Sequence, residues 1–176
     1  MRILSILLFL FCVVACKPKP PVVREPVPVS DDTTFLTGTF YIVRHAESLP
    51  GADTLLTAEG RQRVGALYRL LKDSGINKIY ITPDRQTIAT ADSLRIRLHL
   101  DTCFYHIDTT GESFIYQVTR HEDWGKHILV VAHTHTILPI LRSLKGQLPA
   151  NSGFEADQLL IVRKYTGGTT VTEVCY

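Results

Sequence analysis

Short apolar runs alternate with longer amphipathic segments along most of the chain. Three runs rich in β-branched and aromatic residues predict strands, at residues 39–43, 78–82 and 127–133. Three segments with apolar side chains at helical spacing predict helices, at residues 57–75, 85–98 and 134–144, the last with Pro139 in its first turn. The third strand, HILVVAH, is apolar throughout, which indicates burial on both faces.

Strand and helix in alternation predict an α/β fold with three layers, in which a mostly parallel sheet carries helices on both faces. The end of the chain departs from this alternation. Residues 157–176 contain two β-rich runs joined by Gly167 and Gly168, which is a signal for a two-residue hairpin. We therefore expect a C-terminal antiparallel hairpin at one side of the sheet.

The first 34 residues have a different character. Arg2 precedes an apolar run, and Val13, Val14 and Ala15 lead into Cys16, a pattern that resembles the signal of bacterial lipoproteins. This resemblance implies a signal peptide at 1–15, a lipidated Cys16 that begins a proline-rich tether at 16–34, and a folded domain at 35–176. An uncleaved membrane anchor is the alternative, but the apolar run is shorter than the roughly 20 residues that span a bilayer.

A lipidated Cys16 would attach the domain to a membrane on the periplasmic side of a bacterial envelope, with the choice between inner and outer membrane left open. The charges are nearly balanced, with 19 Lys and Arg against 17 Asp and Glu, so no basic face predicts nucleic-acid binding. A small molecule is the expected partner. Cys103 and Cys175 remain in the domain, and whether they form a disulfide stays open.

Distinctive polar residues follow each of the three predicted parallel strands. Arg44 and His45 follow the first, 82–85 the second and 133–135 the third. Because the carboxyl ends of parallel strands meet at one edge of the sheet, these residues are expected to converge there. Arginine binds phosphate through a planar fork, and neutral imidazole is a good nucleophile, so this set predicts phosphoryl transfer without a metal or cofactor.

Four blocks of the chain resemble the histidine phosphatase superfamily, in the branch that includes the phosphoglycerate mutases. The blocks are YIVRHAES, LTAEGRQRVGAL, IYITPDRQTIATADSL and VVAHTHTILPIL, and they occur in the family's order over nearly the whole domain. The resemblance implies a phosphoglycerate mutase-like fold and a metal-independent hydrolase of the histidine acid phosphatase type, which acts on a small phosphorylated substrate.

The same resemblance implies a role for individual residues. His45 would be the nucleophile that becomes phosphohistidine, and His133 would donate to the phosphoryl oxygens. Arg44 would bind the phosphate, and Glu47 would belong to the phosphate-binding set and orient His45 or its loop. Thr134 and His135 would line the phosphate site.

Two departures from the family pattern concern the second arginine and the proton donor. The family arginine should lie three residues after Pro83, a position that holds Gln86, whereas Arg85 lies two residues after it. We expect Arg85 to take the role because its side chain is long, and Gln86 is the alternative. Three acidic residues between the second helix and the third predicted strand are candidate proton donors, namely Asp101, Asp108 and Glu112. Of these we select Asp108.

Three other functions are compatible with these residues. The first is a phosphoglycerate-type mutase, and the second is a weakly active module that binds a phosphorylated ligand at the cell envelope. The third is a metallohydrolase built on His133 and His135, which would need a third ligand.

Overall fold

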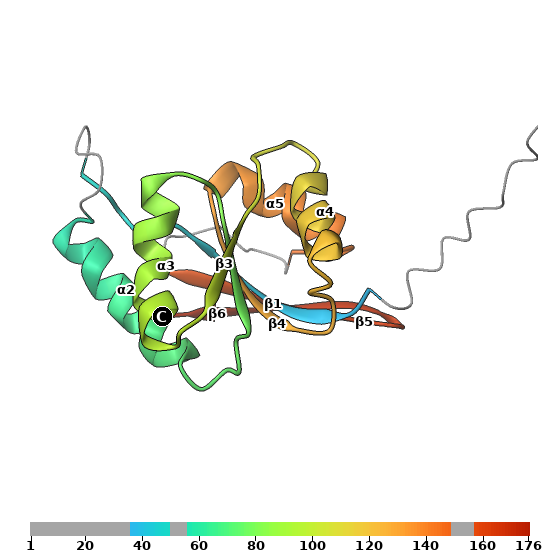
Figure 1. Ribbon diagram of the computed structural model, residues 1–176, viewed down its shortest axis with the longest axis horizontal. Coiled ribbons are helices and arrows are strands. Elements are labelled where there is room, and N and C mark those ends of the chain that lie inside the picture. Colours follow the sequence, from blue (N-terminus) through green and yellow to red (C-terminus); the bar gives the residue numbers. More distant parts are fainter. Residues whose placement is uncertain (1–35, 50–55, 149–156) are drawn as a thin grey trace, which may run out of the picture. The chain divides into compact units, whose positions relative to one another are not determined.

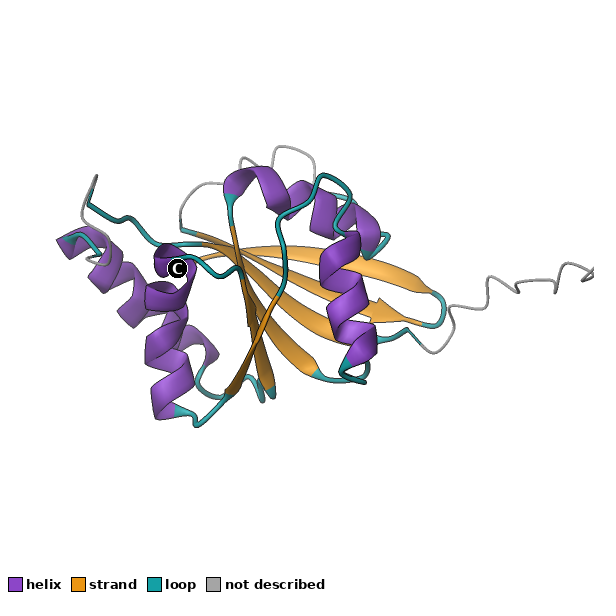
Figure 2. Cartoon of the chain, turned by 45° about the horizontal axis from the view of Figure 1, so that its top comes forward, coloured by secondary structure: helices purple, strands orange, loops and turns teal. Residues whose placement is uncertain are grey.

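Six strands form one mixed sheet in the order β3-β2-β4-β1-β5-β6 (Figures 1 and 2). The computed structural model describes residues 36–49, 56–148 and 157–176. The strands are β1 (Gly38–Arg44), β2 (Lys78–Ile81), β3 (Asp101–Phe104), β4 (His127–Ala132), β5 (Gln158–Tyr165) and β6 (Gly168–Cys175). The first four are parallel, and β5 and β6 form an antiparallel hairpin beside β1.

Within the described ranges, four helices cover the two faces of the sheet, as expected for an α/β fold with three layers (Figure 1). They are α2 (Ala58–Leu71), α3 (Arg85–Arg97), α4 (Glu112–Arg120) and α5 (Thr134–Ser143). Helices α2 and α3 lie on one face, and α4 and α5 lie on the other. The fold class expected from the sequence is confirmed.

The two faces of the sheet are built from alternate residues of its central strands. In β1, Phe40 and Ile42 pack with the core under α4 and α5, whereas Tyr41 and Val43 pack with the core under α2 and α3. In β4, every residue from 128 to 132 has zero exposure. Period-two side-chain alternation therefore fills both cores from the same strands, and the predicted double-sided burial of this strand is confirmed.

The structure contains a strand and a helix that the sequence analysis did not predict. Strand β3 is a four-residue edge strand with exposed ends, so it carries no long apolar run. Helix α4 buries only Phe114 and Val118, which lie one helical turn apart. That pair is the sequence signal for this helix, and it was missed because the segment also contains residues typical of turns.

Two local predictions were wrong by a few residues. Pro139 is the sixth residue of α5, so it lies in the second turn, not the first. The hairpin loop consists of Thr166 and Gly167, because Tyr165 pairs with Gly168 across the two strands. Strand register places the hairpin loop, and composition alone does not specify it, whereas the position of Pro139 follows from the start of α5 at Thr134.

The thiols of Cys103 and Cys175 are both free. They lie on β3 and β6, which are the two opposite edges of the sheet. Five inter-strand spacings of about 4.8 Å separate these edges, far beyond the reach of a disulfide. The two residues therefore do not pair within this chain.

The signal peptide, Cys16 and the tether lie outside the described residues. Within the described ranges, no helix combines the length and apolar character that crossing a bilayer requires.

Candidate active site

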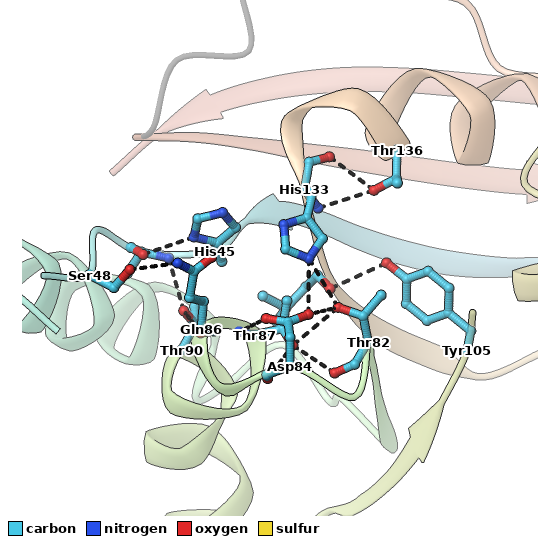
Figure 3. A network of polar contacts seen from close by, with 12 residues as sticks. His45, Ser48, Thr82, Asp84, Gln86, Thr87, Thr90, Tyr105, His133 and Thr136 are labelled. Atoms are coloured by element: carbon cyan, nitrogen blue, oxygen red, sulfur yellow. Dashed lines mark hydrogen bonds and ion pairs between the residues drawn. The ribbon is translucent and has the colours of Figure 1, made fainter. Parts of the chain in front are cut away.

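His45 and His133 lie side by side at the carboxyl edge of the sheet. His45 directly follows β1 and His133 directly follows β4, and these strands pair in parallel so that Arg44 is opposite Ala132. The two imidazole rings have centroids 4.9 Å apart at an angle of 62° (Figure 3). The predicted convergence of these two histidines is thus present in the structure.

The tautomer of His45 follows from its backbone contact. Its Nδ1 lies 3.0 Å from the carbonyl oxygen of Ala46, which can only accept a hydrogen bond. Nδ1 therefore carries the proton in the neutral ring, and Nε2 holds the free electron pair. Burial lowers the pKa of His45, the bond to Ala46 partly opposes this, and the neighbouring His133 and Arg44 lower it further. The ring is kept in its nucleophilic form.

The loop that carries His45 is held by hydrogen bonds to α2 and α3. The N–H of Ala46 donates to Oγ1 of Thr90 at 2.9 Å, and Thr57, the N-cap of α2, donates its N–H to the carbonyl of Glu47 at 2.9 Å. Gly60 in α2 permits this approach, since a Cβ there would lie 2.3 Å from the same Glu47 oxygen. The loop is thus fixed from both sides.

Glu47 has its side chain bound to α2. Nε and Nη2 of Arg63 donate to its two carboxylate oxygens at 2.9 and 2.6 Å. These hydrogen bonds lower the pKa of Glu47, although burial acts in the opposite direction. A carboxylate bound in this bidentate way repels phosphate and holds the loop, so the geometry favours the orienting role over phosphate binding.

Asp84 completes the site, and the sequence analysis did not select it. As N-cap of α3 it accepts the N–H of Thr87 through Oδ1 at 3.1 Å. Its other oxygen, Oδ2, lies 2.9 Å from Nε2 of His133 and also accepts the hydroxyl of Thr82 (Figure 3). The sequence does contain a signal for this residue, because Asp84 is an aspartate at a strand end, directly before a predicted helix and next to Arg85.

The two candidates for the second cationic position lie at the start of α3. Gln86 donates from Nε2 to Oγ of Ser48 at 2.8 Å, so its side chain contacts the loop that follows His45 (Figure 3). Arg85 is exposed.

Arg44 is part-buried, and its Nε has no hydrogen-bond partner among the described residues. A bound oxyanion would accept a hydrogen bond from this buried N–H beside His45, which otherwise has no partner in the described part of the chain.

Thr134 and His135 form the exposed first turn of α5. The ring of His135 stacks on that of His133, with centroids 5.6 Å apart and an angle of 23° between the planes. The free N–H groups of such a helix start favour a bound anion. No group of three or more His, Cys, Asp or Glu side chains within the described ranges is arranged to hold a metal ion.

Comparisons with known proteins identify the fold. No family model and no curated protein matches the chain. Among solved structures, a chain from Agrobacterium tumefaciens assigned as the phosphohistidine phosphatase SixA has a TM-score of 0.62 and 18% identity over 81% of this chain and 99% of its own. A protein histidine phosphatase SixA complexed with tungstate has a TM-score of 0.61 and 19% identity, over 78% and 96%. A mycobacterial glucosyl-3-phosphoglycerate phosphatase has a TM-score of 0.57 and 16% identity, over 78% and 97%.

The chain has the phosphoglycerate mutase-like fold.

Within this phosphoglycerate mutase-like fold, the candidate proton donors occupy different settings. Asp108 accepts the backbone N–H groups of Thr110, Gly111 and Ser113, so both of its oxygens serve the turn that starts α4. Asp101 and Glu112 are exposed, in β3 and at the start of α4. The carboxylate with a direct contact to a site histidine is Asp84. Asp108 as proton donor stays a prediction.

Proposed function

We propose that this protein is a phosphatase that hydrolyses phosphomonoesters or related phosphoryl compounds through a phosphohistidine intermediate on His45. The observation that supports this function most strongly is the pair of imidazoles with centroids 4.9 Å apart, in which the Nδ1 of His45 contacts the Ala46 carbonyl and leaves Nε2 free to attack. A lone strand-end histidine would be an ordinary loop residue, but a nucleophile beside a second imidazole and a part-buried guanidinium forms a site for an oxyanion.

The reaction has two steps. Nε2 of His45 attacks phosphorus, and the bond from phosphorus to the leaving oxygen breaks as that oxygen takes a proton from the predicted donor, Asp108, or from solvent. Water then attacks the phosphoryl group and gives up a proton to the same acceptor, the P–N bond breaks, and inorganic phosphate leaves while His45 is regenerated. Arg44 and His133 neutralise the charge on the phosphoryl oxygens in both steps. Arg85 is proposed as the second guanidinium that binds the phosphoryl group, and Thr134 and His135 are proposed to line the exposed side of the phosphate site.

The structural neighbours support a phosphoryl substrate. Two of them are named as phosphatases, and one of these is complexed with tungstate, an oxyanion shaped like phosphate. Lipid on Cys16, which the sequence predicts, would hold this activity at a membrane surface on the periplasmic side.

A second candidate is a weakly active module that binds a phosphorylated ligand. The observation that favours it is Gln86, a neutral side chain that contacts the loop of His45 where the family places an arginine. This candidate predicts that vanadate binds tightly while an aryl phosphate is not turned over.

The decisive experiment combines turnover with trapping of the intermediate. Wild type, His45→Ala and the matched control His121→Ala, an exposed histidine in a turn, are assayed for phosphate release from p-nitrophenyl phosphate, with and without a chelator. We expect His45→Ala to lose roughly a thousandfold or more in kcat, because the nucleophile is gone, while His121→Ala and the chelator have no effect.

Trapping identifies the residue that carries phosphate. Acid-labile 32P from a labelled phosphoryl substrate should appear on the wild type and be absent from His45→Ala. Full turnover by His45→Ala would refute this function. Activity that a chelator abolishes would instead support a metallohydrolase, and conversion of a phosphoglycerate to its isomer without phosphate release would support a mutase.

A further inference from the structure

Asp84 divides its two carboxylate oxygens between structure and the active site. Oδ1 caps α3 through the N–H of Thr87, and Oδ2 faces Nε2 of His133 at 2.9 Å. The side chain of His133 is 16% exposed and that of Asp84 is 34% exposed, so the contact is partly shielded from water, more on the imidazole side than on the carboxylate side. A helix cap needs only one of these oxygens, so the second one is available for another task.

The contact determines which nitrogen of His133 carries a proton. Burial alone would raise the pKa of Asp84, but hydrogen bonds from Thr82, from the N–H of Thr87 and from His133 lower it. The ionised carboxylate only accepts hydrogen bonds, so Nε2 of His133 must be the donor. Among the described residues, the contacts of this ring with Thr82 and Asp84 both involve Nε2.

The other nitrogen, Nδ1, is therefore the one that can contact a ligand. Figure 3 shows it on the side of the ring that faces His45. If the ring were neutral with its proton on Nε2, then Nδ1 would present a lone pair to the phosphoryl oxygens and repel them. A ring protonated on both nitrogens presents an N–H there and adds a positive charge.

We propose that Asp84 is a positioning residue that holds the proton on Nε2 of His133 and stabilises the doubly protonated ring, so that Nδ1–H donates to the transferred phosphoryl group. This inference rests on the proposed function of the same site. It explains why a negative side chain is present in an oxyanion site, since its charge is directed at the back of His133. Asp84 does not touch the phosphoryl group and takes part in no covalent step.

The test compares Asp84→Asn with Asp84→Ser and with the control Asp92→Asn. Asn and Ser are both good N-caps, so α3 keeps its start while the carboxylate is lost. Asp92 lies on the same helix and pairs with Arg95 at the surface, so its replacement controls for charge alone. We expect both Asp84 variants to lose about tenfold in kcat on p-nitrophenyl phosphate with a much smaller change in KM, because a charge-assisted hydrogen bond becomes a neutral one. Asp92→Asn should match the wild type.

Two further measurements do not require turnover. The 15N NMR signals of the His133 ring, assigned through their loss in His133→Gln, should show Nε2 protonated in the wild type and unprotonated in Asp84→Asn, where the amide donates to it. Vanadate should bind several-fold more weakly to Asp84→Asn than to Asp92→Asn.

Three results would overturn the proposal. They are an unprotonated Nε2 in the wild type, an unchanged kcat in both Asp84 variants of an active enzyme, and tighter vanadate binding by Asp84→Asn. The last result would mean that Asp84 competes with phosphate for His133. If the wild type hydrolyses nothing, the proposed function fails, but the NMR and vanadate measurements still decide the role of Asp84.

Discussion

The close approach of α2 to the loop of His45 makes a single methyl group informative. Gly60 lies in the first turn of α2, and a Cβ at this position would lie 2.3 Å from the carbonyl oxygen of Glu47. Real Cβ contacts essentially never fall below 3.0 Å, so Gly60→Ala requires a displacement of at least 3.0 − 2.3 = 0.7 Å. The atom that must move is backbone, two residues after the nucleophile.

The substitution Gly60→Ala is expected to affect both the free energy of unfolding and the catalytic rate. Overpacking costs about 1–3 kcal/mol, and the better helix propensity of alanine returns about 1 kcal/mol, so the free energy of unfolding should fall by only about 0–2 kcal/mol. Misplacement of a reacting group by about 1 Å can cost roughly 100-fold. We therefore expect kcat to fall about tenfold or more while the protein remains folded.

The matched control lies on the same helix. A Cβ at Gly65 would have as its nearest neighbour Nη1 of Arg69 at 3.5 Å, an ordinary contact with a flexible side chain. Gly65→Ala should therefore be at least as stable as the wild type in urea unfolding and equally active. Wild-type kcat in Gly60→Ala, measured on protein that urea unfolding shows to be folded, would refute the claim that this contact positions His45.

Two other predictions follow from the electrostatics. Because burial lowers the pKa of His45 below its ordinary value of 6.5, and the neutral ring is the nucleophile, the loss of kcat/KM that accompanies protonation of His45 at acid pH should be centred below 6.5; a loss at acid pH centred above 6.5 would contradict this. Asp123 is fully buried and bonded to the Tyr80 hydroxyl at 2.6 Å, to Lys126 at 2.5 Å and to Lys78 at 3.1 Å. Asp123→Ala leaves these partners uncompensated and should lower the free energy of unfolding by about 3–5 kcal/mol in urea, whereas a loss under 1 kcal/mol would show that the cluster is solvated.

The sequence by itself determined the alternation of elements and therefore the fold class. Burial of β4 on both faces and the cap of α2 at Thr57 are local consequences of residue type, and both are readable without a structure. The convergence of His45 and His133 was also predictable, because the carboxyl ends of parallel strands meet at one edge whatever the loop sequences are.

Tertiary structure alone decided which polar side chains contact one another. Asp84 reaches His133 across 49 residues of sequence, and Glu47 binds Arg63 rather than a ligand. The short edge strand β3 and the pairing of Tyr165 with Gly168 likewise depend on neighbouring strands. Local propensity and periodicity act over a few residues, whereas these contacts depend on the register of the strands and the packing of the helices, which no window of sequence contains.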